Sequence, residues 1–206
     1  MHYNLIMKVF SKLSPYNCIW LLFIVNIIFI GLAIYFYNGH FLFWEYPLSY
    51  AGMVKTYDGA PNIIASRIYS VGMILSGLIA WALANNLDRR KIKSKGASNR
   101  LLFYVCGLGF IIAGFSPDDT RHIFHVIGSA LFVATLWIIT TNYLFKLRDT
   151  LGRRQYLILQ ITLQVPIFTY AITYFSDMPI QSLIQKFTMI GIIILLYAMR
   201  LSGEAK

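Results

Sequence analysis

Six long apolar runs are the feature of this sequence that most restricts its fold. A helix needs about 20 mostly apolar residues to cross the hydrocarbon core of a bilayer. Hydrophobic residues make up 58% of the chain and charged residues only 13%, well below the usual share in soluble proteins. We therefore predict an all-α, polytopic transmembrane bundle of six helices that forms one integral membrane domain over residues 1–206. The six predicted spans lie near residues 18–37, 65–84, 101–115, 122–144, 156–175 and 183–199.

The distribution of charge predicts the orientation of this bundle. If the N-terminus lies in the cytoplasm, 14 of the 18 Lys and Arg residues fall on cytoplasmic segments. Segments rich in Lys and Arg stay in the cytoplasm, so both termini are expected there. The net charge of +10 then reflects topology, and no nucleic acid partner is predicted. We expect an integral protein of a bacterial inner membrane, or of a plasma membrane or endomembrane.

One segment, SPDDTRHIFHVIGSALF at residues 116–132, places two carboxylates, an arginine and two histidines before an apolar run. Its spacing predicts a helix start with Ser116 as the N-cap, Pro117 at the first helical position and Asp119 at the third. Ser-x-x-Asp resembles a capping box, and Pro is favoured at the first position of a helix. This interpretation accounts for the carboxylates without any ligand.

Helix capping does not account for the histidines of this segment. At about 100° per residue, Asp118, Arg121, His122 and His125 fall on one stripe of a helix. His125 would lie more than two turns into the span, where an ionisable group is costly and normally faces the bundle interior. We treat such a residue as a functional-site hypothesis.

Two alternatives remain open for the polar groups on the predicted outer face. The first is a polar cluster that organises the first outer loop or binds a lipid head group, with an arginine on the lipid phosphate. Its members are Ser49, Arg67, Asp118, Arg121, His122 and His125.

The second alternative is a zinc site in which a metal-bound water attacks a lipid ester or amide. Its candidate ligands are His40, His122, His125 and Asp118. The sequence has no H-E-x-x-H pattern and no second histidine-rich helix. We therefore prefer the cluster without a cofactor and keep zinc as the alternative.

A few polar or small residues inside the apolar runs indicate contacts between helices. Gln160 and Gln164 are four residues apart and share a helix face, from which they can bond to another helix. Asn26 is expected to act in the same way, and Gly72 and Ser76 are expected at a close helix contact.

Two stretches resemble a known family. They are YPLSYAGMVKTYDGAPNIIASRIYSVGMILSGL at residues 46–78 and FSPDDTRHIFHVIGSALFVATLW at residues 115–137. The first is similar to the first outer loop, and the second to the start of the fourth span, of the DRAM/Frag/Sfk-type membrane proteins and their bacterial relatives. His125, followed by Gly128 and Ser129, matches the family histidine, whereas His122 is extra. The turn before it also carries one inserted residue.

The resemblance implies a six-helix membrane protein that handles or organises lipids rather than one with a shared reaction. Alkaline ceramidase and adiponectin-receptor hydrolases have seven spans and a third histidine near the chain end, whereas this sequence has no histidine after His125. We predict a non-enzymatic, lipid-interacting membrane protein whose partners are membrane lipids. A metal-dependent lipid hydrolase is the alternative. A small-solute transporter is less favoured because inverted repeats and matched broken helices are not evident.

Overall fold

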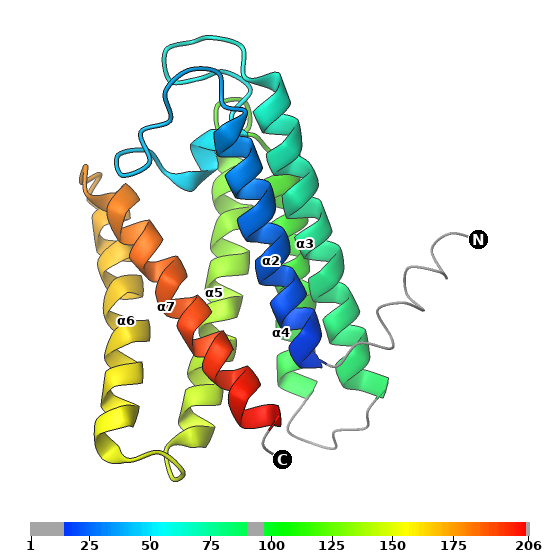
Figure 1. The fold of residues 1–206 in the computed structure, drawn as a ribbon, viewed down its shortest axis with the longest axis vertical. Coiled ribbons are helices and arrows are strands. Elements are labelled where there is room, and N and C mark those ends of the chain that lie inside the picture. Colours follow the sequence, from blue (N-terminus) through cyan, green and yellow to red (C-terminus); the bar gives the residue numbers. More distant parts are fainter. Residues whose placement is uncertain (1–14, 90–96, 205–206) are drawn as a thin grey trace. The chain divides into compact units, whose positions relative to one another are not determined.

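The fold is entirely helical over the part of the chain that is described. The computed structural model describes residues 15–89 and 97–204. Within these residues it contains six α-helices, one short 3-10 helix and no β-strand (Figure 1). The helices are α2 (Pro15–Tyr35), η1 (Leu48–Gly52), α3 (Ile63–Arg89), α4 (Ala97–Phe115), α5 (His122–Leu147), α6 (Arg153–Phe175) and α7 (Gln181–Glu204).

Each predicted apolar run coincides with an α-helix, except that the first extends past the end of α2 at Tyr35, so the prediction of a helical bundle is confirmed. Four helices are long and apolar enough to cross a membrane: Asn17–Tyr35, Ile63–Asn86, His122–Leu147 and Arg153–Phe175. The apolar parts of α4 and α7 within the described residues, Arg100–Phe115 and Gln181–Tyr197, are shorter. Most of the basic residues that set the predicted orientation lie in residues 1–14 and 90–96 or at the C-terminal end, outside the described side chains.

The contacts within the chain divide it into two compact units. Unit 1 comprises Met1–His40 and Ser49–Leu136, and unit 2 comprises Phe41–Leu48 and Trp137–Lys206. The boundary falls inside α5, whose first part belongs to unit 1 and whose second part belongs to unit 2. The prediction of a single domain stays a prediction.

Unit 1 is held together by small residues where helices approach each other. Helix α3 packs against both α2 and α4. A Cβ atom on Gly77 of α3 would lie 2.6 Å from the carbonyl oxygen of Gly107 on α4, and one on Gly109 would lie 2.7 Å from that of Gly128 on α5. Larger residues there would push the helices apart, which explains glycine at these crossings.

Polar side chains inside unit 1 also join helices. The Nδ2 of Asn26 on α2 donates a hydrogen bond to Oγ of Ser76 on α3 at 2.8 Å, and a second to the carbonyl of Leu22. Both Asn26 and Ser76 are buried. The prediction that Asn26 contacts another helix is confirmed, and the amide does not remain unsatisfied in an apolar environment.

Unit 2 contains a polar chain between α5 and α6. Trp137 Nε1 donates to Gln164 Oε1 at 2.8 Å, and Gln164 Nε2 donates to Thr141 Oγ1 and Gln160 Oε1, each at 3.2 Å. Gln160 in turn donates to the hydroxyl of Tyr156. The two glutamines therefore share a face, as predicted, and Gln164 bonds across to the neighbouring helix.

Residues Phe41–Leu48, here called the strap, bind to α7 within unit 2. The amide of Leu48 donates to Gln185 Oε1 at 3.0 Å. Lys186 Nζ donates to the carbonyl oxygens of Tyr46 and Ser182, each at 2.9 Å. Lys186 is 5% exposed, so its ammonium group lies inside unit 2. Backbone carbonyls surround its ammonium group and make the burial tolerable.

Candidate functional site

The polar residues predicted as a site gather at one end of unit 1, here called the loop end. It consists of residues 37–40, the segment 49–62 and the turn 116–121. These connectors join α2 to α3 and α4 to α5. Ser49, Asp118 and Arg121 of the predicted cluster lie in these connectors, whereas Arg67, His122 and His125 lie on the adjoining helices α3 and α5.

Asn62 is the centre of the segment 49–62. Its Nδ2 donates to the carbonyl oxygens of Ala51 at 3.4 Å and Met53 at 2.9 Å, and its Oδ1 accepts from the amide of Asn38 at 3.2 Å. Ser66 on α3 adds a bond from its hydroxyl to the carbonyl of Gly52 at 2.8 Å. Buried backbone groups need such partners, so the loop folds against the end of α3. Sequence reasoning did not single out Asn62.

Asp119 ties the turn 116–121 to the segment 49–62. Its Oδ1 accepts from the amide of Val54 at 3.1 Å and its Oδ2 from that of Lys55 at 2.9 Å. Helix α5 begins at His122, and the amides of Thr120 and Arg121 both bond to the carbonyl of Pro117. The predicted helix start at Ser116 is therefore wrong: Asp119 lies in a turn before the helix and serves another loop instead of capping α5.

His125 and Ser116 form a buried contact beneath this turn. His125 is 5% exposed, and its Nδ1 lies 2.8 Å from the carbonyl oxygen of Ser116. A carbonyl oxygen only accepts, so Nδ1 carries the hydrogen of this bond. The histidine thus satisfies a backbone carbonyl at the end of α4. It is buried as expected, but it lies in the first turn of α5 and not more than two turns into a helix.

His122 behaves differently from His125. Its side chain is 67% exposed, and its Nδ1 lies 2.7 Å from Asp118 Oδ1. The adjacent Arg121 donates from its guanidinium to the carbonyl of Phe115 at 3.2 Å. The predicted stripe is thus divided between a buried histidine and an exposed His–Asp pair.

The remaining predicted residues do not join these contacts. Ser49 is half-buried at the start of the segment 49–62, while His40 and Arg67 are exposed. Among the described residues, no group of three or more His, Cys, Asp or Glu side chains is arranged to hold a metal ion. Of the four candidate zinc ligands, the structure brings only Asp118 and His122 into contact. The zinc alternative gains no support from this geometry.

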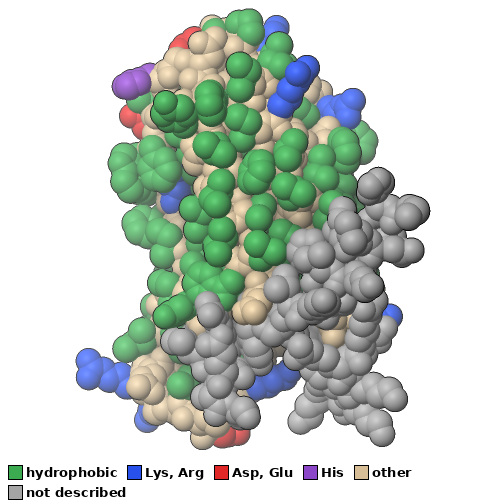
Figure 2. Space-filling view, turned by 45° about the vertical axis from the view of Figure 1, so that its right-hand side comes forward, with side chains coloured by type: hydrophobic (Ala, Val, Ile, Leu, Met, Phe, Trp, Pro, Cys, Tyr) green, Lys and Arg blue, Asp and Glu red, His purple; other side chains and the backbone are tan. Residues whose placement is uncertain are grey.

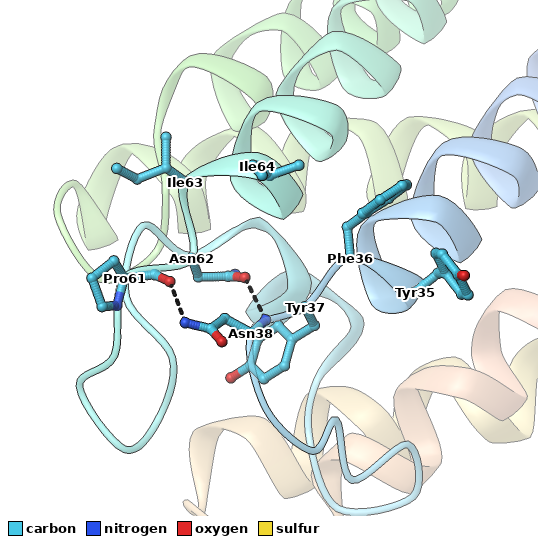
Figure 3. A pocket seen from close by; sticks show the side chains of 8 residues that line it. All are labelled: Tyr35, Phe36, Tyr37, Asn38, Pro61, Asn62, Ile63 and Ile64. Carbon is cyan, nitrogen blue, oxygen red and sulfur yellow. Dashed lines mark hydrogen bonds between the residues drawn. The ribbon is translucent and has the colours of Figure 1, made fainter.

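An open recess lies at the side of the loop end, between the last residues of α2 and the first of α3. Its volume is about 490 Å³, and Figure 3 shows its lining side chains, with Asn38 and Asn62 between the aromatic residues at and after the end of α2 and the isoleucines of α3. Asn38 Nδ2 donates to the carbonyl of Pro61 at 2.9 Å, which joins the two walls. The lining residues are Tyr35, Phe36, Tyr37, Asn38, Pro61, Asn62, Ile63 and Ile64.

Large apolar side chains at this recess are exposed. Tyr35 is 79% exposed and Ile64 is 64% exposed. Exposed aliphatic side chains continue along α2 and α3, and Figure 2 shows hydrophobic side chains over much of the face in view. An apolar wall with amide groups at its base suits the boundary between the head groups and the acyl chains of a bilayer. Aromatic residues at the end of one span and isoleucines at the start of the next were the sequence features that could have indicated this recess.

Arg67 lies next to the recess on α3. It follows Ile63 and Ile64 by four and three residues, so the three side chains share one face of the helix. Side chains on a helix tilt toward its N-terminus, which directs Arg67 toward the recess. No hydrogen bond or ion pair joins the Arg67 side chain to any residue that the structure describes.

Comparisons with known proteins leave the chain unassigned. No protein-family model matches it, and neither curated proteins nor solved structures give a match. The resemblance to the DRAM/Frag/Sfk-type proteins therefore stays a prediction.

Proposed function

We propose that this chain is a non-enzymatic, multi-pass membrane protein that binds membrane lipid at the recess of its loop end. In this proposal the six described helices cross the membrane, both termini lie in the cytoplasm, and the loop end faces outward. The concentration of Lys and Arg on segments at the opposite side of the spans supports this orientation. The loop end then lies at the outer head-group layer.

The recess is the observation that carries this proposal. Except for the buried Tyr37, its walls are aromatic and aliphatic side chains that are exposed in the isolated chain, and the exposed Asn38 and the buried Asn62 lie at its base. An acyl chain can cover the walls and remove apolar surface from water, at about 25 cal/mol for each Å² buried. The glycerol and ester groups of a lipid can reach the exposed side chain of Asn38, whereas the amide of Asn62 already bonds to three backbone groups.

The use of the other polar residues supports a non-enzymatic role. Asp119 accepts two backbone amides, His125 contacts a backbone carbonyl, and Asn62 holds three backbone groups. These side chains fold the loop end and are not free to act on a substrate. Of these three residues, only His125 belongs to the polar cluster predicted from the sequence.

Photocrosslinking tests the proposal. The full chain is reconstituted in vesicles that contain a phospholipid with a diazirine on its acyl chain, and the labelled residues are identified by mass spectrometry. We expect strong labelling at residues 35–38 and 61–64 that unlabelled phospholipid displaces. Ile161 and Val165 on the exposed face of α6 are the internal control for ordinary boundary lipid. Equal and equally non-saturable labelling of both regions would overturn the proposal.

Cysteine accessibility tests the orientation separately. Asp58 and Asp149 are both exposed, and they lie at opposite ends of the proposed spans. A membrane-impermeant thiol reagent should label Asp58→Cys in intact cells and should label Asp149→Cys only after permeabilisation. Cys18 and Cys106 are buried and provide a low background. The reverse labelling pattern would show that the loop end faces the cytoplasm.

A further inference from the structure

We infer that Arg67 makes the recess selective for phospholipids whose head group carries a net negative charge. The inference rests on the proposed lipid binding and adds the chemical class of the ligand. It starts from an anomaly on α3, where a single arginine interrupts an exposed apolar face.

The exposed face of α3 consists otherwise of aliphatic side chains. Val71 is 48% exposed and lies one turn after Arg67, while Ile63 and Ile64 lie one turn before it. Leu75 and Leu78 continue the same face. In a membrane such a stripe meets lipid, and a cation within it is costly unless it reaches the interface or finds an anion.

The protein itself does not supply that anion among the described residues. Of the acidic side chains of the loop end, Asp119 accepts two backbone amides and Asp118 contacts His122. Asp58 is exposed and forms no ion pair with Arg67. The guanidinium therefore keeps its full donor capacity for a ligand from outside the chain.

A lipid phosphate fits this arrangement. An arginine donates two parallel hydrogen bonds to a phosphate, and its tilt toward the N-terminus of α3 brings it to the recess that holds the rest of the lipid. A zwitterionic lipid carries an ammonium group that offsets its own phosphate, whereas an anionic lipid leaves the charge of the phosphate to Arg67. Selectivity for net negative head groups follows from this difference.

The test compares two lipids that differ only in the head group. The full chain in mild detergent is titrated with phosphatidylglycerol or phosphatidylcholine of identical acyl chains, and bound lipid is counted by native mass spectrometry. Wild type should prefer phosphatidylglycerol. Arg67→Gln should lose about fivefold of this preference, the effect of one basic residue at an anionic membrane surface.

Two further variants separate this effect from general charge. Lys55→Ala removes one positive charge from the same loop end. The Lys55 side chain is exposed and has no hydrogen bond or ion pair among the described residues. The Lys55→Ala variant should therefore prefer phosphatidylglycerol as strongly as wild type does. Arg67→Lys keeps the charge but not the two parallel donors, and its preference should fall between those of wild type and Arg67→Gln. Because Arg67 is exposed, all of these variants should keep the circular dichroism and the thermal unfolding of the wild type.

The outcomes distinguish the inference from the proposed function. Equal losses in Arg67→Gln and Lys55→Ala would show a diffuse surface effect and overturn the role of Arg67. A wild type without head-group preference, but with displaceable crosslinks at the recess, would overturn the inference and leave the lipid site standing. If lipid forms no displaceable crosslinks at the recess, both the proposed lipid site and the role of Arg67 are wrong.

Discussion

Gln164 is the residue whose loss should most clearly reveal how unit 2 is held together. Its amide accepts one hydrogen bond from Trp137 and donates one each to Thr141 and Gln160. Two of these three bonds cross from α6 to α5. Gln164→Leu keeps a side chain of similar size and removes all three bonds.

The expected magnitude follows from the number of bonds. A hydrogen bond between helices in a membrane contributes about 0.6 kcal/mol on average, so three bonds contribute about 2 kcal/mol. The indole N–H of Trp137 also loses its acceptor, which adds about 1 kcal/mol if it stays buried. We expect Gln164→Leu to lower the free energy of unfolding by about 2 to 3 kcal/mol.

Unfolding by sodium dodecyl sulfate in mixed micelles, followed by circular dichroism, measures this loss. Gln160→Leu is the matched control, because the bonds of Gln160 stay within α6, to Tyr156 and Gln164. Gln160→Leu should lower the free energy of unfolding by about half as much as Gln164→Leu. A double-mutant cycle with Trp137→Phe isolates the Trp137–Gln164 bond, and the two changes should be less than additive. A Gln164→Leu protein as stable as wild type, or strictly additive changes, would refute this reasoning.

Three other substitutions test separate parts of the fold. Thr188 is buried and its Oγ1 has no hydrogen-bond partner among the described residues, so Thr188→Val should raise the free energy of unfolding by about 1 kcal/mol in the same micelle assay. Gly109→Val should lower the free energy of unfolding by about 2 kcal/mol, because the added atoms meet the backbone of α5. An unchanged free energy of unfolding would exclude the close contact of α4 and α5. Asp119→Ala should raise the hydrogen-exchange rates of the Val54 and Lys55 amides, measured by mass spectrometry, and unchanged protection there would remove Asp119 from its assigned role.

The helices could be predicted from the sequence because their cause is local. Unbroken apolar runs specify spans wherever they occur, and polar residues within them, such as Asn26 and Gln164, must find partners on neighbouring helices. The structure provides those partners in Ser76 and Trp137. Buried polar groups in an apolar helix therefore reveal a contact before its partner is known.

The loop end could be predicted only in part, because its contacts link segments far apart in the chain. The spacing of Ser116 and Asp119 fits a helix cap, but Asp119 contacts a loop 64 and 65 residues earlier. The burial of Lys186 could not be predicted, because its acceptors are the backbone carbonyls of Tyr46 and Ser182, which residue types do not indicate. The recess likewise depends on how two chain segments meet, which no local pattern encodes.

The strap has a consequence for the order in which the chain can be completed. Its bonds to α7 join residues separated by 137 positions for Leu48 and Gln185, and by 140 for Tyr46 and Lys186. During synthesis the strap therefore cannot form these hydrogen bonds until α7, the last described helix, has been made. Contacts of such long sequence separation form late, because the intervening chain must be ordered first. A nascent chain halted before α7 would hold the strap without a partner, so the second turn of α7 acts as the closing step of assembly for unit 2.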